Sequence, residues 1–361
     1  MTEETPTKDL ITSYPEKVNT FIRRIKEDFS SDKILKYLDD IKNLKVLVIG
    51  EIIIDEYIYC DALGKSGKEA TLAMKYRYSE QYAGGVLAIA NHISNFCDNV
   101  TLASYLGERN SKEEFVRENL NKNIETIFIS KSDSPTIVKQ RIIDKYSLAK
   151  LLGVYDINDE WLDSEEEKEL TDILEKRLSE FDLVIIADYD HGLITPRIVD
   201  LLTEKAPFLS VNTQVNAANI GFHAISKFRR ADFICTNESE IRLDRRSRTG
   251  DLKELIKDLA TKLSCDKIMI TRGTNGSMVY TKNEGFIACP AFAIKIVDRV
   301  GAGDAVLSIT SMLAAINAPA DIISFVGNLV GAEAVAVVGN KKSIQQDLLI
   351  KGINDFLKNV S

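Results

Sequence analysis

The sequence predicts one doubly wound α/β domain, in which helices cover both faces of a mostly parallel sheet. From residue 45 onward, apolar runs of strand length alternate with amphipathic segments of helix length. Several runs, such as 45–49, 183–187 and 267–271, are apolar almost throughout, which is typical of strands buried on both faces. Polar or glycine-rich turns follow these runs, at the sheet edge where open α/β folds bind ligands.

The composition excludes several classes of protein. The 361 residues are 45% hydrophobic and 28% charged, which suits a folded core rather than a disordered chain. A formal net charge of −8 argues against general nucleic-acid binding, and no apolar run is long enough to span a membrane. The start is polar and acidic, unlike a signal peptide, and the scattered cysteines form no C-x-x-C pair. We therefore expect a cytoplasmic protein with reduced thiols and with neither nucleic acid nor membrane as a partner.

Residues 1–44 are predicted to form a helical N-terminal extension of the main domain, which occupies residues 45–361. Apolar residues recur at helical spacing between 18 and 41, and Ser30-Ser31-Asp32 offers a break with a new helix cap. We expect two amphipathic helices packed on the main domain, preceded by about ten loose residues.

The most informative stretch is Gly301-Ala302-Gly303-Asp304, which lies between a β-branched approach and a helix-like apolar run. A tight turn that opens a helix directs several backbone N–H groups at one point and suits an anion. Gly301 and Gly303 allow a close approach or a positive φ in such a turn. A carboxylate would repel a phosphate there unless it removes the proton of an attacking hydroxyl, so Asp304 is a candidate general base. The alternative is that Asp304 only caps the helix.

Charges suited to a small polar ligand occur at two places in the first half of the chain. Asp55 lies just beyond the first predicted strand, either as a ligand contact or as a turn cap. Residues 134–143 alternate strictly, so Lys139 and Arg141 share one face of a predicted strand. Two neighbouring cations suit a phosphate or a carboxylate, and the alternative is a solvated strand face.

Later strands also end in polar turns. Asp188 and Asn212 each follow or end an apolar strand. Asn237 and Glu240 are three residues apart, as in a helix-capping pair. A single glutamate with retained water also suffices for Mg²⁺, so this pair could cap a helix and serve a metal ion at once.

These motifs follow the order found in the ribokinase-like (PfkB-type) carbohydrate kinases, which the chain resembles over residues 45–357. Asp298-x-x-Gly301-Ala302-Gly303-Asp304 resembles the C-terminal signature of that family, and Asn237-x-x-Glu240 resembles its magnesium motif. The resemblance implies a ribokinase-like fold with a small lid sheet, whose strands lie near 52–80 and 134–150. It also implies transfer of the γ-phosphoryl group of Mg·ATP to a sugar hydroxyl.

The resemblance assigns the site residues to three groups. The catalytic group consists of Asp304 as the base and the backbone of Gly301, Ala302 and Gly303 around the phosphate. The substrate group is Asp55, Gly84, Gly85, Asn91, Lys139, Arg141 and Asp188. The nucleotide group is Asn212, Asn237, Thr271, Gly273, Gly276 and Asn340, and Glu240 organises the metal ion.

The strand with Thr136, Lys139 and Arg141 resembles that of the bacterial D-glycero-D-manno-heptose-7-phosphate kinase branch. A sugar phosphate, and heptose 7-phosphate in particular, is therefore the expected acceptor. Lid strands in this family often form a dimer surface, so we expect a homodimer. Many relatives carry a second, nucleotidyltransferase domain for which 361 residues leave no room, so we expect only the kinase step.

Several positions depart from the family pattern, among them Glu51 where the family has its first Asp, and three others bear on the function. Ala88 replaces an Asn that contacts the sugar, with an Asn one helical turn later at 91. His191 stands where many relatives have Lys, although a single loop histidine is usually a surface residue, and Arg299 replaces a usual Thr. Two alternatives follow: a kinase of the same fold for another sugar or a nucleoside, or a catalytically weak regulatory protein that binds sugar or nucleotide.

Overall fold

The computed structural model describes residues 14–217 and 219–359. The expected loose residues at the start of the chain lie outside these ranges. Within them, no helix combines the length and the apolar character needed to cross a membrane. The five cysteines are all buried, and none forms a disulfide.

The main sheet has nine strands in the order β13-β12-β11-β10-β9-β8-β1-β4-β5. The strands from β5 to β11 in that order are parallel, and β12 and β13 are antiparallel additions at one edge. The prediction of a doubly wound, mostly parallel sheet is confirmed. The strands are β1 (Lys45–Gly50), β4 (Asn99–Arg109), β5 (Ile124–Pro135), β8 (Leu183–Asp188), β9 (Leu209–Thr213), β10 (Phe233–Asn237), β11 (Lys267–Thr271), β12 (Ser277–Thr281) and β13 (Gly285–Cys289).

The strand order reverses between β1 and β8. The chain builds outward from β1 through β4 to β5, then returns to β8 and builds in the other direction. At this point β1 and β8 run side by side, with Gly50 opposite Ala187. Ligands of open α/β sheets bind beyond the carboxyl ends of the strands at such a reversal. The fold therefore directs attention to Glu51 and to the turn after Asp188.

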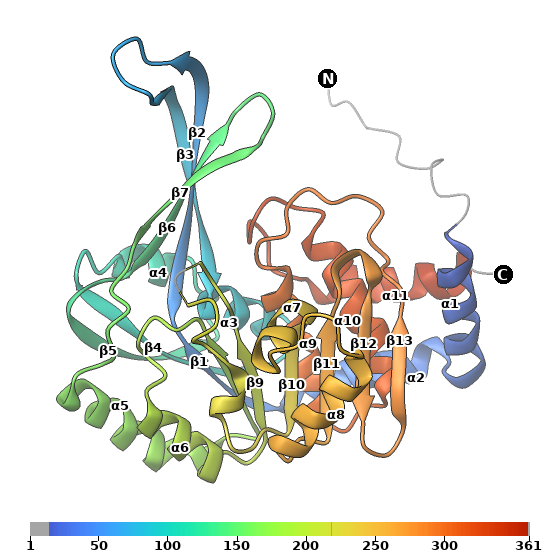
Figure 1. Cartoon of the computed structure of the whole chain (residues 1–361). Coiled ribbons are helices and arrows are strands. Elements are labelled where there is room, and N and C mark those ends of the chain that lie inside the picture. Colours follow the sequence, from blue (N-terminus) through green and yellow to red (C-terminus); the bar gives the residue numbers. More distant parts are fainter. Residues whose placement is uncertain (1–13, 218, 360–361) are drawn as a thin grey trace.

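Helices cover both faces of the sheet (Figure 1). Helices α5 to α8 lie on one face, and α3, α9 and α10 lie on the other. The helices that follow the N-terminal extension are α3 (Val86–Ser94), α4 (Glu113–Glu118), α5 (Ser164–Arg177), α6 (Pro196–Lys205), α7 (Glu238–Asp244), α8 (Leu252–Lys262), α9 (Ala302–Ala315), α10 (Ala320–Ala334) and α11 (Gln346–Asn359). Short 3-10 turns occur at η1 (Ile41–Asn43), η2 (Leu178–Glu180), η3 (Ile225–Lys227) and η4 (Gly273–Asn275).

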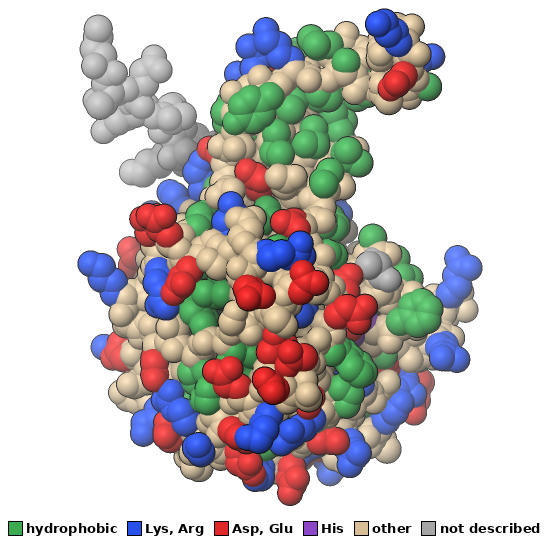
Figure 2. Space-filling model, turned by 90° about the vertical axis from the view of Figure 1, so that its left-hand side faces the viewer, with side chains coloured by type: hydrophobic (Ala, Val, Ile, Leu, Met, Phe, Trp, Pro, Cys, Tyr) green, Lys and Arg blue, Asp and Glu red, His purple; other side chains and the backbone are tan. Residues whose placement is uncertain are grey.

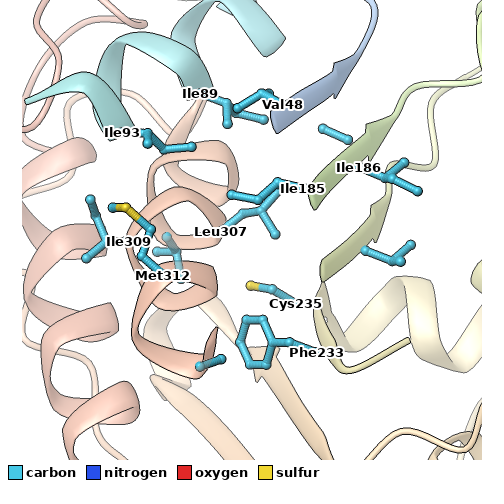
Figure 3. Packing of buried hydrophobic residues seen from close by; sticks show 14 of the residues in the cluster. Val48, Ile89, Ile93, Ile185, Ile186, Phe233, Cys235, Leu307, Ile309 and Met312 are labelled. Atoms are coloured by element: carbon cyan, nitrogen blue, oxygen red, sulfur yellow. The ribbon is translucent and has the colours of Figure 1, made fainter. Parts of the chain in front are cut away.

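Helix α9 lies at the centre of the core. Figure 3 shows Leu307, Ile309 and Met312 of this helix packed among side chains of α3, β1, β8 and β10. Every residue of α9 from Asp304 to Ala314 is buried. A helix that is apolar on all sides needs packing on all sides, and here the sheet, α3 and α10 supply it. The core therefore holds the N-terminal end of α9 in a fixed place.

A second sheet, called the lid below, projects from the carboxyl edge of the main sheet (Figure 1). Its strand order is β3-β2-β6-β7, with β2 parallel to β6 and the other neighbours antiparallel. The strands are β2 (Ile52–Lys65), β3 (Leu72–Gly85), β6 (Ile137–Asp144) and β7 (Lys150–Asp156).

Large apolar side chains remain exposed on the lid, and Figure 2 shows them gathered on this projecting part of the molecule. Tyr146, at the turn between β6 and β7, is 98% exposed. We call this group the lid patch; it consists of Leu63, Leu72, Tyr76, Tyr78, Tyr146, Leu148, Leu151, Leu152, Val154 and Tyr155.

Two helices, α1 (Glu16–Asp28) and α2 (Ser31–Asp40), precede the main domain. Helix α1 lies beside β13, and its Phe21 ring is 6.2 Å from that of Phe292. Ser31 at the start of α2 donates a hydrogen bond of 2.6 Å to Asn354 of α11. The extension therefore covers the edge of the main sheet at β13, where unpaired backbone groups would otherwise offer a place for another strand.

Candidate active site

A cavity of about 630 Å³ lies between the lid and the carboxyl ends of the central strands. Its size is that of a site for a small ligand. Cationic and anionic side chains both face it, which suits a polar, charged occupant. The lining residues are Ile53, Asp55, Gly85, Lys139, Arg141, Leu148, Lys150, Tyr189, Gln214, Ile296, Val297, Asp298, Arg299, Val300, Gly301, Gly303 and Asp304.

The predicted anion turn opens helix α9 directly at this cavity. Gly301 has a φ of 79°, and a side chain there would collide with the amide of Asn340, so the position requires glycine. Ala302, Gly303 and Asp304 form the first turn of α9, where backbone N–H groups have no acceptor within the helix. Gly301 occupies the N-cap position of α9 and Asp304 lies inside its first turn, with its carboxylate bonded to Tyr189, so the alternative of a simple helix cap is wrong.

The Asp304 carboxylate is buried at the floor of the cavity. Its Oδ1 accepts a hydrogen bond of 2.9 Å from the Tyr189 hydroxyl. Burial raises the pKa of Asp304 to about 7, and the hydrogen bond from Tyr189 opposes this rise. The negative charge of Asp55 raises the same pKa, and the positive charge of Lys139 lowers it. A carboxyl group that titrates near neutral pH is suited to general-base chemistry.

The turn after β8, which carries Tyr189, is anchored by Glu51 at the end of β1. Glu51 is fully buried, and its carboxylate accepts hydrogen bonds from the backbone N–H groups of Tyr189, His191 and Leu193 at 3.1–3.2 Å. Burial and the nearby Asp188 raise the pKa of Glu51 to about 7. Glu51 therefore binds the protein rather than a ligand, and it connects the two strands at the reversal of strand order.

Asp55 lies on the lid side of the cavity and is paired with Arg141. In the lid, Asp55 of β2 lies directly opposite Lys139 of β6. Arg141 is two residues further along β6 on the same face, so it is the diagonal neighbour of Asp55 and can reach it. The Asp55 carboxylate rests against Gly84, where any side chain would collide with it. Asp55 and Arg141 thus reach the cavity as a pair.

Lys139 is 8% exposed and lines the cavity. Its ammonium group lies 5.7 Å from the centre of the Tyr155 ring. Among the residues that the structure describes, no carboxylate lies within ion-pair distance of it. Burial lowers its pKa, while the more distant Asp55 raises it. Because Lys139 is buried and Arg141 is half-buried and paired with Asp55, the alternative of a solvated strand face is wrong.

Asp298 connects the lid to the anion turn. Its Oδ1 accepts hydrogen bonds from Lys150 of β7 at 2.6 Å and from the backbone N–H of Arg299 at 2.7 Å. Its Oδ2 accepts from the Tyr57 hydroxyl at 2.6 Å and from the Gly339 N–H at 3.1 Å. One carboxylate therefore ties two lid strands to the loop that precedes α9.

Asn91, Asp188 and His191 are among the residues that lie outside the cavity lining. The Asn91 amide donates to the carbonyl of Asn119 and holds that turn. Asp188 is buried and paired with Lys227 and, at 3.6 Å, with His223. His191 is buried, contrary to the expectation of a surface position, and its Nδ1 lies 2.6 Å from Asp159. The loop that carries Asp159 covers it, which the sequence around His191 does not reveal.

The residues predicted to bind nucleotide lie along the carboxyl ends of β9, β10 and β11. Asn212 donates to the Cys235 carbonyl at 2.7 Å, and Asn237 lies opposite Thr271 in the sheet. Gly273 and Gly276 have φ angles of 55° and 80° in the turn that follows. Asn340 lies apart from them, against Gly301.

Glu240 is buried beside this row. It forms a reciprocal capping pair with Asn237 at the start of α7 and also accepts a hydrogen bond of 2.7 Å from Thr236. In the described ranges no group of three His, Cys, Asp or Glu residues could hold a metal ion on its own. This arrangement suits an ion that arrives on nucleotide phosphates and keeps most of its water, with Glu240 as a contact through water.

No motif or spacing in the sequence singled out Lys150 or Gln214, which both line the cavity. Lys150 reaches Asp298 because the β6–β7 hairpin folds back over the anion turn. No sequence motif contains both residues, so their ion pair could not be predicted. Tyr189 was visible in the turn after β8, but its contact with Asp304 spans 115 residues.

The model of the pfkB family of carbohydrate kinases matches residues 43–347. Two curated relatives, both named bifunctional protein HldE, come from Koribacter versatilis and Campylobacter jejuni. The first is 26% identical over 88% of this chain and 66% of its own length, and the second is 27% identical over 82% and 61%. The matched region therefore spans less than two thirds of each of these relatives.

Solved structures share the fold at low sequence identity. Phosphofructokinase-2 from Escherichia coli, crystallised with potassium, has a TM-score of 0.67 at 13% identity, over 87% of this chain and 99% of that one. Ribokinase from Thermotoga maritima has a TM-score of 0.65 at 16% identity, over 86% and 99%. Ribokinase from Arabidopsis thaliana with ribose and ATP has a TM-score of 0.63 at 14% identity, over 88% and 99%. These likenesses show that the architecture is ribokinase-like.

Proposed function

The chain belongs to the pfkB family of carbohydrate kinases, and from that premise we propose that this sugar kinase acts on a sugar that already carries a phosphate. Heptose 7-phosphate is the first acceptor to test, because the Thr136–Arg141 strand resembles that of heptose-phosphate kinases. The likeness to the HldE proteins supports the same choice.

One observation carries this proposal: Lys139 is a buried cation at the cavity without a carboxylate partner among the described residues. Removing a charge from water is costly unless the charge is paired. A phosphate on the acceptor would supply the missing partner, and the Arg141 guanidinium lies on the same strand face. Arg141 is already balanced by Asp55, so Lys139 provides the uncompensated charge.

The floor of the cavity suits the transfer step. Asp304 would accept the proton of the acceptor hydroxyl as that oxygen attacks the γ-phosphorus of ATP, whose bond to the β–γ bridging oxygen breaks. The N–H groups at the start of α9 would hold the equatorial oxygens of the transferring group. ADP and the new phosphate ester leave, and Asp304 returns its proton to water.

ATP would lie along the carboxyl ends of β9 to β11, with Asn212, Asn237, Thr271, Gly273 and Gly276 beside it. Glu240 would orient the water bound to Mg²⁺, which offsets the negative charge of the phosphates. The capping pair with Asn237 holds Glu240 in place for this role.

The test compares Lys139→Met with wild type on two acceptors, a sugar phosphate and the same sugar without its phosphate. A charge-assisted hydrogen bond to phosphate is worth about 1.5–3 kcal/mol, so the KM for the sugar phosphate should rise about 10–150-fold. The KM for the unphosphorylated sugar should scarcely change, because that ligand has no anion to lose. Arg141→Ala is a weaker test, since it also leaves Asp55 unpaired and would affect both acceptors.

Lys145→Met is the matched control. Lys145 also lies over a tyrosine ring, 5.6 Å from the centre of Tyr78, but it does not line the cavity. It should leave both KM values unchanged. Equal losses for the two acceptors in Lys139→Met, or a wild-type preference for the unphosphorylated sugar, would remove the sugar-phosphate assignment and leave the chain a kinase for another sugar.

We also propose that the lid patch joins two copies of the chain. Exposed apolar patches of this kind mark interaction surfaces, and the lid strands offer hydrogen-bonding edges as well. Sedimentation of wild type and of Leu152→Asp would test this, with a dimer expected for the first and a monomer for the second. Leu348→Asp, at a leucine of α11 that is also more than half exposed, is the control and should stay dimeric.

A further inference from the structure

The base has a hydrogen-bond donor that transfer chemistry alone does not require. Tyr189 is buried, and its hydroxyl donates to Oδ1 of Asp304 at 2.9 Å. Within the described part of the chain no hydrogen bond reaches the other oxygen of Asp304, while the residue itself lines the cavity. One carboxylate oxygen is thus occupied by the protein and the other is open to the cavity.

We infer that Tyr189 is a positioning residue for Asp304, and that Glu51 holds Tyr189 in place to serve it. The hydroxyl fixes one carboxylate oxygen and thereby aims the other at the acceptor hydroxyl. This inference rests on the proposed role of Asp304 as the base.

Two successive contacts hold the Asp304 carboxylate in position, and the first lies where the strand order reverses between β1 and β8. Glu51 follows β1 and accepts the backbone N–H of Tyr189 at 3.1 Å, and it accepts those of His191 and Leu193 at 3.2 Å. These bonds fix the turn after β8 on a carboxylate that is itself fully buried. The Tyr189 ring then spans the distance from this turn to the first turn of α9. Because α9 is packed on all sides, the two ends of this contact are held by separate parts of the core.

The same hydrogen bond helps to keep the base ionised. Burial favours the protonated form of Asp304, as do the negative charges of Asp55 and Glu240. Tyr189 and Lys139 favour the carboxylate. The proton in the hydrogen bond stays on Tyr189, because burial and the charge of Asp304 hold the pKa of this phenol well above its ordinary value. Tyr189 is therefore a donor to the carboxylate over the whole working range of pH.

The first test is Tyr189→Phe, which removes the hydroxyl and keeps the ring. We expect kcat to fall about 10–100-fold, with KM values for ATP and acceptor nearly unchanged. The midpoint of the kcat–pH profile should move upward by about 1–2 units, because a carboxylate that loses a donor is harder to ionise. A purely structural role would lower the amount of active enzyme without moving this midpoint.

Tyr105→Phe is the matched control. Tyr105 is equally buried, and its hydroxyl donates at 3.1 Å to the backbone carbonyl of His191 in the same turn. The variant loses a similar hydrogen bond but has no contact with Asp304, so its pH midpoint should equal that of wild type. An unchanged midpoint in Tyr189→Phe, or an equal shift in both variants, overturns the inference.

A second measurement needs neither turnover nor the Tyr189 variant. In protein labelled with ¹³C at the tyrosine Cζ, one resonance should titrate with Asp304 in wild type and should lose that titration in Asp304→Asn. A spectrum in which no tyrosine responds to Asp304 overturns the inference. If that resonance titrates but no sugar is phosphorylated, the contact stands and the proposed function fails.

Discussion

The floor and the roof of the cavity are built in different ways. The floor consists of Glu51, Tyr189 and Asp304, which come from strand ends and from α9 and are connected by hydrogen bonds deep in the main core. The roof consists of Lys139 and Arg141 on a lid sheet of four strands that also carries exposed apolar side chains. The floor can therefore keep its geometry when the lid changes. In the function proposed above, bond making belongs to the floor and the choice of acceptor belongs to the roof.

The largest effect should come from removing the base on the floor. Asp304→Asn keeps the size of the side chain but cannot accept the proton, and the loss of a general base typically lowers a rate by about 10²–10⁴-fold. ATP affinity should stay close to wild type, which equilibrium binding of the nucleotide would measure. A variant that turned over at the wild-type rate would contradict the separation of floor and roof.

The floor should also set the pH dependence. The pKa of Asp304 is raised to about 7 by burial, so the base is protonated and inactive below that pH. We expect kcat/KM to fall about tenfold per pH unit below pH 7 and to level off above it. In Lys139→Met the acidic limb should move only slightly upward, because the loss of that positive charge removes one influence that lowers the pKa of Asp304. A shift of more than about one pH unit in the acidic limb of the kcat/KM–pH profile of Lys139→Met would show that the roof also controls the protonation of the base.

A smaller effect should come from the link between the two regions. Lys150→Met removes the bond from β7 to Asp298 while leaving the bond from Tyr57. Lys150 is partly exposed, so we expect a rise of only about 3–10-fold in the KM for the acceptor and little change in kcat. Steady-state kinetics would measure this, and Lys150→Arg, which restores the charge, should recover most of the loss. A fall in kcat alone would place Lys150 in the chemistry of the floor.

An effect of similar size should appear at the magnesium contact. Glu240→Gln weakens an arrangement that acts through water, so we expect the Mg²⁺ concentration for half-maximal activity to rise about 3–10-fold, more than the KM for the sugar. Glu238→Gln is a suitable control in the same first turn of α7, because Glu238 is occupied by Arg272 and Arg242. An unchanged magnesium titration in Glu240→Gln would remove this residue from the metal site.

Each region was predictable from the sequence only in part, because Asp304 was singled out on the floor and Glu51 and Tyr189 were not. The glycine turn before Asp304 is local, since four adjacent residues define both the turn and the helix that follows. The strand with Lys139 was also predictable, because strict alternation puts Lys139 and Arg141 on one face. Alternation does not say whether that face meets solvent or a cavity, which depends on how the lid folds over the main sheet.

Contacts between distant segments could not be predicted. Lys150 meets Asp298 across 148 residues, and Tyr189 meets Asp304 across 115. His191 was expected at the surface, yet it is buried below the loop of Asp159. Lys131 holds that loop through backbone carbonyls, including that of Glu160 at 2.6 Å. Such a lysine looks like an ordinary surface charge in the sequence.

The packing of α1 and α2 over the edge of β13 also affects how the polypeptide folds during its synthesis. Helices α1 and α2 leave the ribosome long before the surfaces on which they pack, β13 and α11. Ser31 and Asn354 form a hydrogen bond although 323 positions separate them. Until β13 and α11 have been made, the apolar faces of the two early helices lack these native partners, and chaperones that recognise such faces would find them accessible. The nascent chain therefore completes its outer edge last, when a late helix captures an early one.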